Sequence, residues 1–190
     1  MAGERKLQIL QALAEMLQTP TAEKVTTAAL AAHLNLSEAA LYRHFASKAQ
    51  MYEGLIGFIE QSIFGLINRI TTTQDSGSAQ LEAMIKMLLG FAEKNPGMAR
   101  VLIGEALVNE NERLQARINQ LLDRIEASLR QSLRIASAQL ETRADATLAA
   151  NLLLCVVIGR WQLFAKSGFK RMPTADFTGQ WEMLRLVFAV

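Results

Sequence analysis

Residues 26–48 read TTAALAAHLNLSEAALYRHFASK, and this stretch decides the fold of the N-terminal part of the chain. Its apolar side chains recur at the spacing of two short helices joined by a tight turn, namely at Leu30, Leu34, Leu36, Leu41 and Phe45. Thr26 or Thr27 can cap the first helix and Ser37 the second, because a hydroxyl oxygen accepts hydrogen bonds from free backbone N–H groups. Two short helices in this order predict a helix-turn-helix, whose second helix enters the major groove of DNA.

The residues around the second helix predict how such a head would contact DNA. Ser37 and Ala39 lie at its start, where small side chains let the backbone approach the base edges. The polar and basic side chains from Tyr42 onward would point at phosphates, and the helix N-terminus at Thr26 would add backbone donors. The candidate DNA-binding residues are Thr26, Thr27, Ser37, Glu38, Ala39, Tyr42, Arg43, His44 and Lys48. The alternative is a small helical hairpin without a role in DNA binding, because short helix pairs are common.

The rest of the chain also has the periodicity of helices and no alternation typical of strands. A first helix around 7–17 ends before Pro20, because proline disfavours helical geometry in the residue before it. The capping box Ser47–Gln50 begins a long helix, which is expected to end before a polar loop at 71–78. The next helix is expected to end at Asn95-Pro96-Gly97. Further helices are expected over residues 106–135, 144–167 and 174–189.

Composition supports a packed helical protein. Hydrophobic residues make up 51% of the chain and charged residues 20%, which is typical of a folded protein with a core. We therefore predict an all-α fold with a helix-turn-helix domain over 1–48 and an all-helical body over 49–190. The net charge of +2, from 20 Lys and Arg against 18 Asp and Glu, indicates no class of partner. The prediction of DNA binding therefore depends on the motif alone.

Other classes of protein find no support in the sequence. The longest apolar run, Leu152–Ile158, has seven residues, so we expect a soluble cytoplasmic protein with no membrane partner. The single cysteine, Cys155, lies inside that run and is expected to be a buried, reduced thiol. A Gly-rich phosphate loop, a metal-ligand cluster and a nucleophile beside a base are all missing, so no enzyme, cofactor or metal site is expected. The carboxylates of Glu110 and Glu112 are expected on a solvated helix face.

The literal residues of the head carry a family resemblance. The pattern Ser37-x-x-Ala40-Leu41-Tyr42-x-His44-Phe45-x-Ser47-Lys48 resembles the signature of the TetR family of DNA-binding regulators. The resemblance implies an all-helical homodimer, in which three N-terminal helices bind a palindromic double-stranded DNA site. It also implies that the last two helices form a four-helix dimer interface. The candidate interface residues are Leu152, Val156, Trp161, Phe164, Trp181, Leu184 and Phe188.

The body is similar to one branch of that family, the nucleoid occlusion factors. The similar stretches are SEAALYRHFASKAQMYEGLIGFIEQSI (37–63), LLGFAEKNPGMARVLIGEAL (88–107) and ERLQARINQLLDRIEASLRQSLR (112–134). This resemblance implies a nucleoid-associated protein whose DNA-bound dimers engage FtsZ, the tubulin-like division protein, and block division-ring assembly over the nucleoid. The chain departs from the pattern at a shortened basic N-terminus, and at Ala46 and Leu66, where proline and arginine would be usual.

Residues 49–190 would then be the dimerisation and partner-binding domain. A groove between the helix that begins near residue 47 and the helix before Asn95 is expected to receive the FtsZ tail. Its candidate wall residues are Phe58, Met87, Gly90, Lys94 and Asn95. The alternative is that the apolar members only pack the two helices together. The alternative function is a ligand-responsive TetR-type transcriptional repressor, with a pocket lined by Met84, Met87, Phe91 and Met98.

Overall fold

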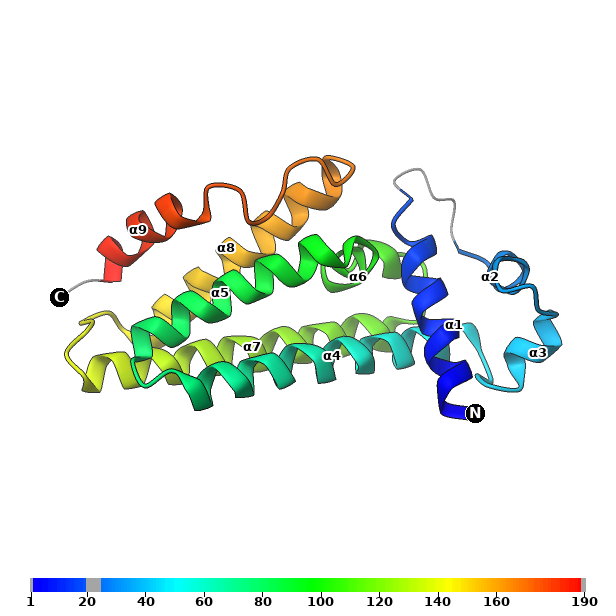
Figure 1. The fold of residues 1–190 in the computed structure, drawn as a ribbon, viewed down its shortest axis with the longest axis horizontal. Helices are drawn as coiled ribbons and strands as arrows, with labels where there is room; N and C mark the ends of the chain where they lie inside the picture. The colour runs from blue at the N-terminus through cyan, green and yellow to red at the C-terminus, as the bar shows by residue number, and fades with distance from the viewer. Residues whose placement is uncertain (1, 20–24, 189–190) are drawn as a thin grey trace. The chain divides into compact units, whose positions relative to one another are not determined.

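The computed structural model describes residues 2–19 and 25–188, without the side chains of Ala2 and Phe188, and these residues form helices and turns without strands (Figure 1). The all-α prediction is therefore confirmed. The helices, in chain order, are α1 (Ala2–Met16), α2 (Thr27–His33), α3 (Glu38–Tyr42), α4 (Lys48–Thr73), α5 (Gly77–Lys94), α6 (Pro96–Leu102), the 3-10 helix η1 (Glu105–Leu107), α7 (Glu112–Ala138), α8 (Ala146–Lys166) and α9 (Phe177–Phe188).

The chain divides into two compact units. Unit 1 comprises Met1–Glu60 and Asn95–Ile118, and unit 2 comprises Gln61–Lys94 and Asn119–Val190. The division does not follow the boundary expected after residue 48. The helix α4 begins at Lys48, and its first part, up to Glu60, belongs to the same unit as the helix-turn-helix, as does the segment from Asn95.

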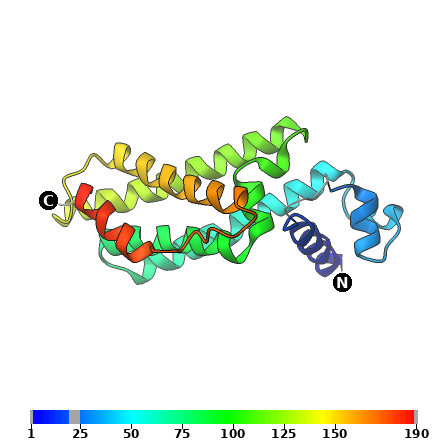
Figure 2. The same cartoon turned by 90° about the horizontal axis from the view of Figure 1, so that it is seen from above.

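In unit 1, α2 and α3 lie on one side of α1 (Figure 1, Figure 2). Ile9 and Leu13 of α1 are fully buried, as are Leu30 of α2 and Leu41 of α3. Of the apolar positions whose spacing predicted the helix-turn-helix, Leu30, Leu41 and Phe45 are buried and Leu34 and Leu36 are half-buried, so the pattern identified part of the core of this unit. Burial of each such side chain contributes about 1.5–3 kcal/mol to folding.

The helix α6 also packs on α1 and was not predicted. Pro96 occupies the first turn of α6, where its missing N–H leaves no hydrogen bond unmade. The sequence Asn95-Pro96-Gly97 therefore ends one helix and begins the next. Arg100 of α6 holds the end of α1, because its Nη1 donates to the carbonyl oxygens of Leu17 (3.1 Å) and Thr19 (3.2 Å).

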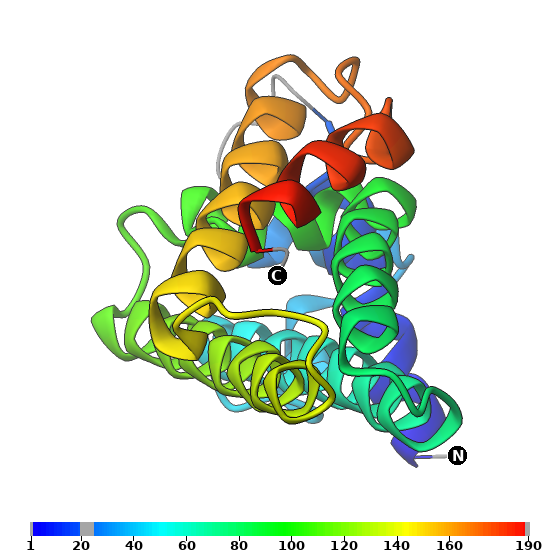
Figure 3. The same ribbon diagram turned by 90° about the vertical axis from the view of Figure 1, so that its left-hand side faces the viewer.

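Unit 2 is a bundle of long helices, seen almost end-on in Figure 3. α5 and α8 pack side by side, and the indole Nε1 of the fully buried Trp161 donates to the carbonyl oxygen of Leu88 (3.1 Å). On the other side, Arg124 of α7 lies 3.9 Å from the ring centroid of Phe64 in α4. The chain ends in α9, where Trp181 is buried against Phe177.

Several boundaries differ from the predicted ones. The helix expected from residue 106 begins at Glu112, after the 3-10 helix η1, and the helix expected from residue 174 begins at Phe177. The polar residues Thr71–Thr73 were expected in a loop, but α4 continues to Thr73. Their hydroxyl groups donate to backbone carbonyl oxygens three or four residues earlier, so the polar side chains are satisfied within the helix. In the head, α3 ends at Tyr42, so the predicted apolar anchor Phe45 lies just beyond the helix.

The helix α8 is the one described helix that is long and apolar enough to cross a membrane by length and composition alone. The core helix of a soluble protein passes the same test, and α8 has such a core face in unit 2. Its buried residues are Ala149, Ala150, Leu153, Leu154, Val157, Trp161 and Phe164.

Candidate DNA interface and assembly faces

Hydroxyl caps fix the two helices of the head in the way the sequence predicted. Thr26 Oγ1 accepts a hydrogen bond from Ala29 N (3.1 Å), and Ser37 Oγ accepts one from Ala40 N (3.2 Å). Each such cap contributes about 1 kcal/mol to the stability of its helix. The turn between the helices passes through Asn35, whose φ of 54° is a left-handed conformation that asparagine tolerates better than most residues.

The recognition surface of α3 is open to solvent. Ser37, Glu38 and Ala39 at its start are exposed, as is Arg43 at its end. Tyr42 is 44% exposed, which is high for an aromatic side chain, and His44 is half-buried. The candidate base-reading and phosphate-binding residues of α3 therefore share one accessible helix and its flank.

Three polar side chains join the start of α2 to α3. Thr27 Oγ1 donates to Glu38 Oε2 (2.7 Å), and the Tyr42 hydroxyl donates to Thr27 Oγ1 (3.5 Å). The Glu38 carboxylate thus engages the hydroxyl of Thr27, one of the candidate DNA-binding residues. A phosphate can use the Thr27 hydroxyl only after Glu38 turns away, and the exposure of Glu38 leaves room for that movement.

Lys48 has a partner that the sequence did not predict. Its Nζ lies 2.6 Å from Glu110 Oε1, and the side chains of Lys48 and Glu110 are 22% and 9% exposed. The expectation that Glu110 lies on a solvated helix face is therefore wrong. Glu110 precedes α7 and its carboxylate is held inside unit 1, where Lys48 balances its charge.

The same ion pair lies against a buried tyrosine. Lys48 Nζ is 5.7 Å from the ring centroid of Tyr52, whose side chain is 1% exposed. Burial and the nearby Glu110 carboxylate raise the pKa of Tyr52 to about 12, so its hydroxyl stays protonated. No local sequence pattern could have paired Lys48 with a residue 62 positions away.

The five candidate wall residues for a partner peptide divide between the units. Phe58 and Asn95 belong to unit 1, whereas Met87, Gly90 and Lys94 lie on α5 in unit 2. The three α5 residues follow one helix face at spacings of three and four, with Lys94 exposed and the other two half-buried. A Cβ added at Gly90 would meet only the Thr174 methyl group, at 3.9 Å, so this face has room beside the backbone.

The predicted dimer-interface residues fall into two groups. Trp161, Phe164 and Trp181 have exposed fractions of at most 4% within one chain, so they are core residues and offer little surface to a partner. Their large side chains fill the core of unit 2. Leu152 is 45% exposed, and Val156 and Leu184 are half-buried, so these three are accessible. The side chain of Phe188 lies outside the described residues.

An exposed apolar stripe on α8 was predicted only at Leu152. It lies on the helix face opposite the buried one and follows the spacing of a single face, through Leu148, Leu152, Cys155, Gly159 and Leu163. Cys155 is exposed, so the expectation of a buried thiol is wrong. A second exposed apolar group lies on α9, at Met183, Leu186 and Val187. The sequence could not separate the two faces of α8, because both are apolar.

The four residues proposed to line the pocket of a ligand-responsive repressor lie on α5 and α6. Met84 and Met98 are buried core residues of different units, and Met87 and Phe91 are half-buried on α5. The described residues also contain no group of three or more His, Cys, Asp or Glu side chains that could hold a metal ion.

Comparison with known proteins agrees with the resemblance of both parts of the chain. The family model "Bacterial regulatory proteins, tetR family" matches residues 9–55, and "Tetracyclin repressor-like, C-terminal domain", of SlmA-like type, matches residues 76–187. The chain is 48% identical to the nucleoid occlusion factor SlmA of Vibrio cholerae over 97% of each protein. It is 46% identical to that of Alteromonas mediterranea over 97% of this chain and 95% of the relative.

A solved structure agrees with the fold. A TetR transcription regulator from Haloarcula marismortui superposes with a TM-score of 0.82 at 15% identity, covering 99% of this chain and all of the other. Similarity at that identity supports the arrangement of helices alone.

Proposed function

The chain belongs to the TetR family, among the SlmA nucleoid occlusion factors, and from this we propose that it binds specific DNA as a homodimer and blocks division-ring assembly over the nucleoid. The observation that carries the proposal is the near-full-length identity to SlmA proteins, because it includes the body as well as the head. The family is one of DNA-binding regulators and not of enzymes. The site of action would be the cytoplasm, at the nucleoid.

The head supplies what the DNA-binding part of the proposal needs. The exposed start of α3 would read base edges, and Tyr42, Arg43 and His44 at its end would contact phosphates. Lys48 would join them by exchanging the Glu110 carboxylate for a phosphate. Arg5 and Lys6 precede the packed part of α1 and are exposed, so they can add electrostatic contacts near the head.

Tyr42→Phe tests the phosphate role of α3. The change removes one exposed hydroxyl, so we expect an unchanged melting temperature and an affinity about fivefold lower. The loss should be equal for the operator and for unrelated DNA, because a phosphate contact carries no sequence information. The salt dependence should not change, because no charge is removed. Fluorescence anisotropy over a salt series measures the affinities for the operator and for unrelated DNA and their salt dependence. A loss confined to the operator would assign Tyr42 to base reading.

The exposed stripes of α8 and α9 support dimerisation. Exposed apolar side chains gather on one face of each helix, and a monomer would leave them in water. Pairing across a two-fold axis would cover both stripes and present two recognition helices to half-sites about 34–36 Å apart on DNA. We propose Leu148, Leu152 and Leu163 of α8 as the core of this interface, with Val156 and Leu184 beside it.

For FtsZ we propose binding to the α5 face that carries Met87, Gly90 and Lys94. Met87 offers apolar area, Gly90 allows a peptide backbone to come close, and Lys94 is an exposed cation at the end of the helix. A peptide bound here would leave the exposed residues of α3 unaltered, so DNA binding and FtsZ binding should be separable.

Lys94→Asp tests this proposal, because it reverses an exposed charge without touching the core. We expect at least a tenfold loss of FtsZ affinity with unchanged melting temperature and DNA affinity. A palindromic DNA site is first obtained by selecting the sequences that the protein binds from a random library. The assay then measures how much purified FtsZ the DNA-bound protein captures. Arg134→Asp, an exposed charge reversal on α7, is the matched control. Full FtsZ capture by Lys94→Asp would reject the α5 face, and no capture by the unaltered protein would reject nucleoid occlusion through FtsZ.

A further inference from the structure

Glu38 carries the one carboxylate among residues 25–48, on the surface that the proposed function turns toward DNA. Its side chain is exposed at the start of α3, beside the small side chains of Ser37 and Ala39. DNA phosphates repel a carboxylate here, so the charge weakens binding to all sequences alike. Such a residue favours one sequence over the others only if it also makes a contact that depends on the base.

A hydrogen bond holds one oxygen of the Glu38 carboxylate. Thr27 Oγ1, at the start of α2, donates to Glu38 Oε2 (2.7 Å) and accepts from the Tyr42 hydroxyl (3.5 Å). Thr27 is half-buried and α2 is in contact with α3, so the donor itself is held in place. Within the described residues, Glu38 Oε1 has no hydrogen-bond or ion-pair partner. The carboxylate therefore keeps one oriented acceptor for a group outside the chain.

The packing of the head does not require a negative charge at this position. Ser37 Oγ already caps α3 by accepting from Ala40 N, and the Thr27 hydroxyl can donate to a neutral amide oxygen as well as to a carboxylate. The bond to Thr27 is exposed, so competition with water leaves it a small contribution to stability. A carboxylate differs from an amide in offering acceptors and no donor. Glu38 therefore suits a base that presents a donor.

The major groove presents two such donors, the N6 amino group of adenine and the N4 amino group of cytosine. In an A·T pair the donor lies between two acceptors, adenine N7 and thymine O4, and both repel a carboxylate. In a C·G pair the donor lies at one edge of the pattern, with acceptors on the guanine side alone. We propose that Glu38 recognises a cytosine in each half-site, with Oε1 accepting from the N4 amino group while Thr27 holds Oε2. This assignment rests on the proposed function, because only a DNA-bound α3 brings Glu38 to a base; in it, Thr27 positions Glu38 and does not bind a phosphate.

The test compares the sequences that the unaltered protein and Glu38→Ala select from one random DNA library. The unaltered protein should select a palindrome with cytosine at one position of each half-site, and Glu38→Ala should select the same palindrome without a preference there. Replacing that cytosine by thymine puts the O4 acceptor in place of the N4 donor. By fluorescence anisotropy, the replacement should lower the affinity of the unaltered protein about tenfold or more and that of Glu38→Ala by about twofold at most.

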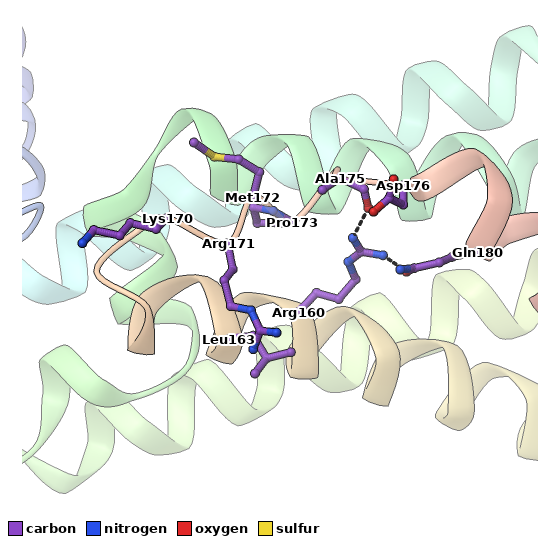
Figure 4. Close-up of a pocket in the computed structure, with 9 residues that line it drawn as sticks. All are labelled: Arg160, Leu163, Lys170, Arg171, Met172, Pro173, Ala175, Asp176 and Gln180. Atoms are coloured by element: carbon purple, nitrogen blue, oxygen red, sulfur yellow. Dashed lines mark hydrogen bonds between the residues drawn. The ribbon is translucent and has the colours of Figure 1, made fainter.

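Two variants that also remove a carboxylate serve as controls. Glu15→Ala removes an exposed carboxylate from α1 in unit 1, and Asp176→Asn removes one just before α9 in unit 2 (Figure 4). Asparagine tolerates the φ of 54° at position 176. Both controls should select the same bases as the unaltered protein. A loss of the cytosine preference in either control equal to that in Glu38→Ala would reduce the effect to overall charge and overturn the proposal.

Thr27→Val tests the positioning role of Thr27, since it removes the hydroxyl and leaves the Thr26 cap of α2 in place. The ratio of the affinities for the cytosine and thymine operators should fall about threefold, because Glu38 is then less well oriented. In the Glu38→Ala background, Thr27→Val should not change this ratio further. A lower affinity for both operators at an unchanged ratio would assign Thr27 to a phosphate and overturn its positioning role.

The outcomes separate this proposal from the proposed function. If Glu38→Ala selects the same cytosine as the unaltered protein, or if the position that depends on Glu38 holds another base, the cytosine contact is overturned while specific DNA binding stands. If the unaltered protein selects no palindrome, both proposals are rejected.

Discussion

Gly97→Ala is expected to destabilise unit 1 by about 3 kcal/mol, at the upper end of the range for overpacking a core. A Cβ at this position would lie 1.9 Å from the carbonyl oxygen of Ala14 and 3.0 Å from its carbonyl carbon. Both are backbone atoms of α1, so no side chain can rotate to relieve the clash. The helix α6 must move away from α1, and the hydrogen bonds from Arg100 to the end of α1 are expected to break with it.

Gly65→Ala is the matched control for this substitution. Gly65 lies in the interior of α4, is exposed, and has nothing within 4 Å of an added Cβ. Alanine there should stabilise the protein by about 0.5–1 kcal/mol, because glycine is the poorer helix former. Urea denaturation followed by circular dichroism compares the two variants. Equal stability of Gly97→Ala and the unaltered protein would contradict the close contact of α6 with α1.

Local features of the fold could be predicted from the sequence, whereas the different packing of Gly97 and Gly65 could not. The head was predicted because its signals are local: hydroxyl caps at Thr26 and Ser37 and leucines at helical spacing all act within a few residues. The sequence Asn95-Pro96-Gly97 predicted the end of a helix, and α5 does end at Lys94. The role of Gly97 against α1 depends on a contact between residues more than 80 positions apart, which a local pattern does not contain.

The candidate site was predicted unevenly for the same reason. The helix-turn-helix motif predicted that Tyr42 points outward, and its side chain is exposed. The ion pair of Lys48 with Glu110 could not be predicted in this way, because it forms only when the segment before α7 packs on α4. On α8, the sequence is apolar all around the helix, so it identified neither which residues form the core nor which are exposed. Trp161 was assigned to the interface because the family resemblance implied that the last two helices form it, but its burial and its hydrogen bond to Leu88 place it in the core.

Leu152→Glu is expected to convert the protein to a monomer in solution. Leu152 lies in the middle of the exposed stripe of α8, so in the proposed dimer a carboxylate there would be buried against an apolar surface. Burial of an unpaired charge is more unfavourable than the contacts of one leucine are favourable, which should dissociate the dimer at micromolar concentration. In the monomer the residue is 45% exposed, so the fold and the melting temperature of the isolated chain should change little.

The loss of the dimer should have a large effect on DNA binding. Two linked heads bind a palindrome with an affinity that can exceed that of one head by a factor of about 10²–10⁴, so Leu152→Glu should weaken operator binding at least a hundredfold. Binding to a single half-site should change much less, because α3 is unaltered. Leu140→Glu is the matched control, because Leu140 is 82% exposed and lies in the turn between α7 and α8, off both stripes. Analytical ultracentrifugation and anisotropy on whole and half operators measure both effects. If Leu152→Glu sediments as a dimer while Leu140→Glu dissociates, the interface lies at the turn, and the proposed pairing of α8 and α9 is wrong.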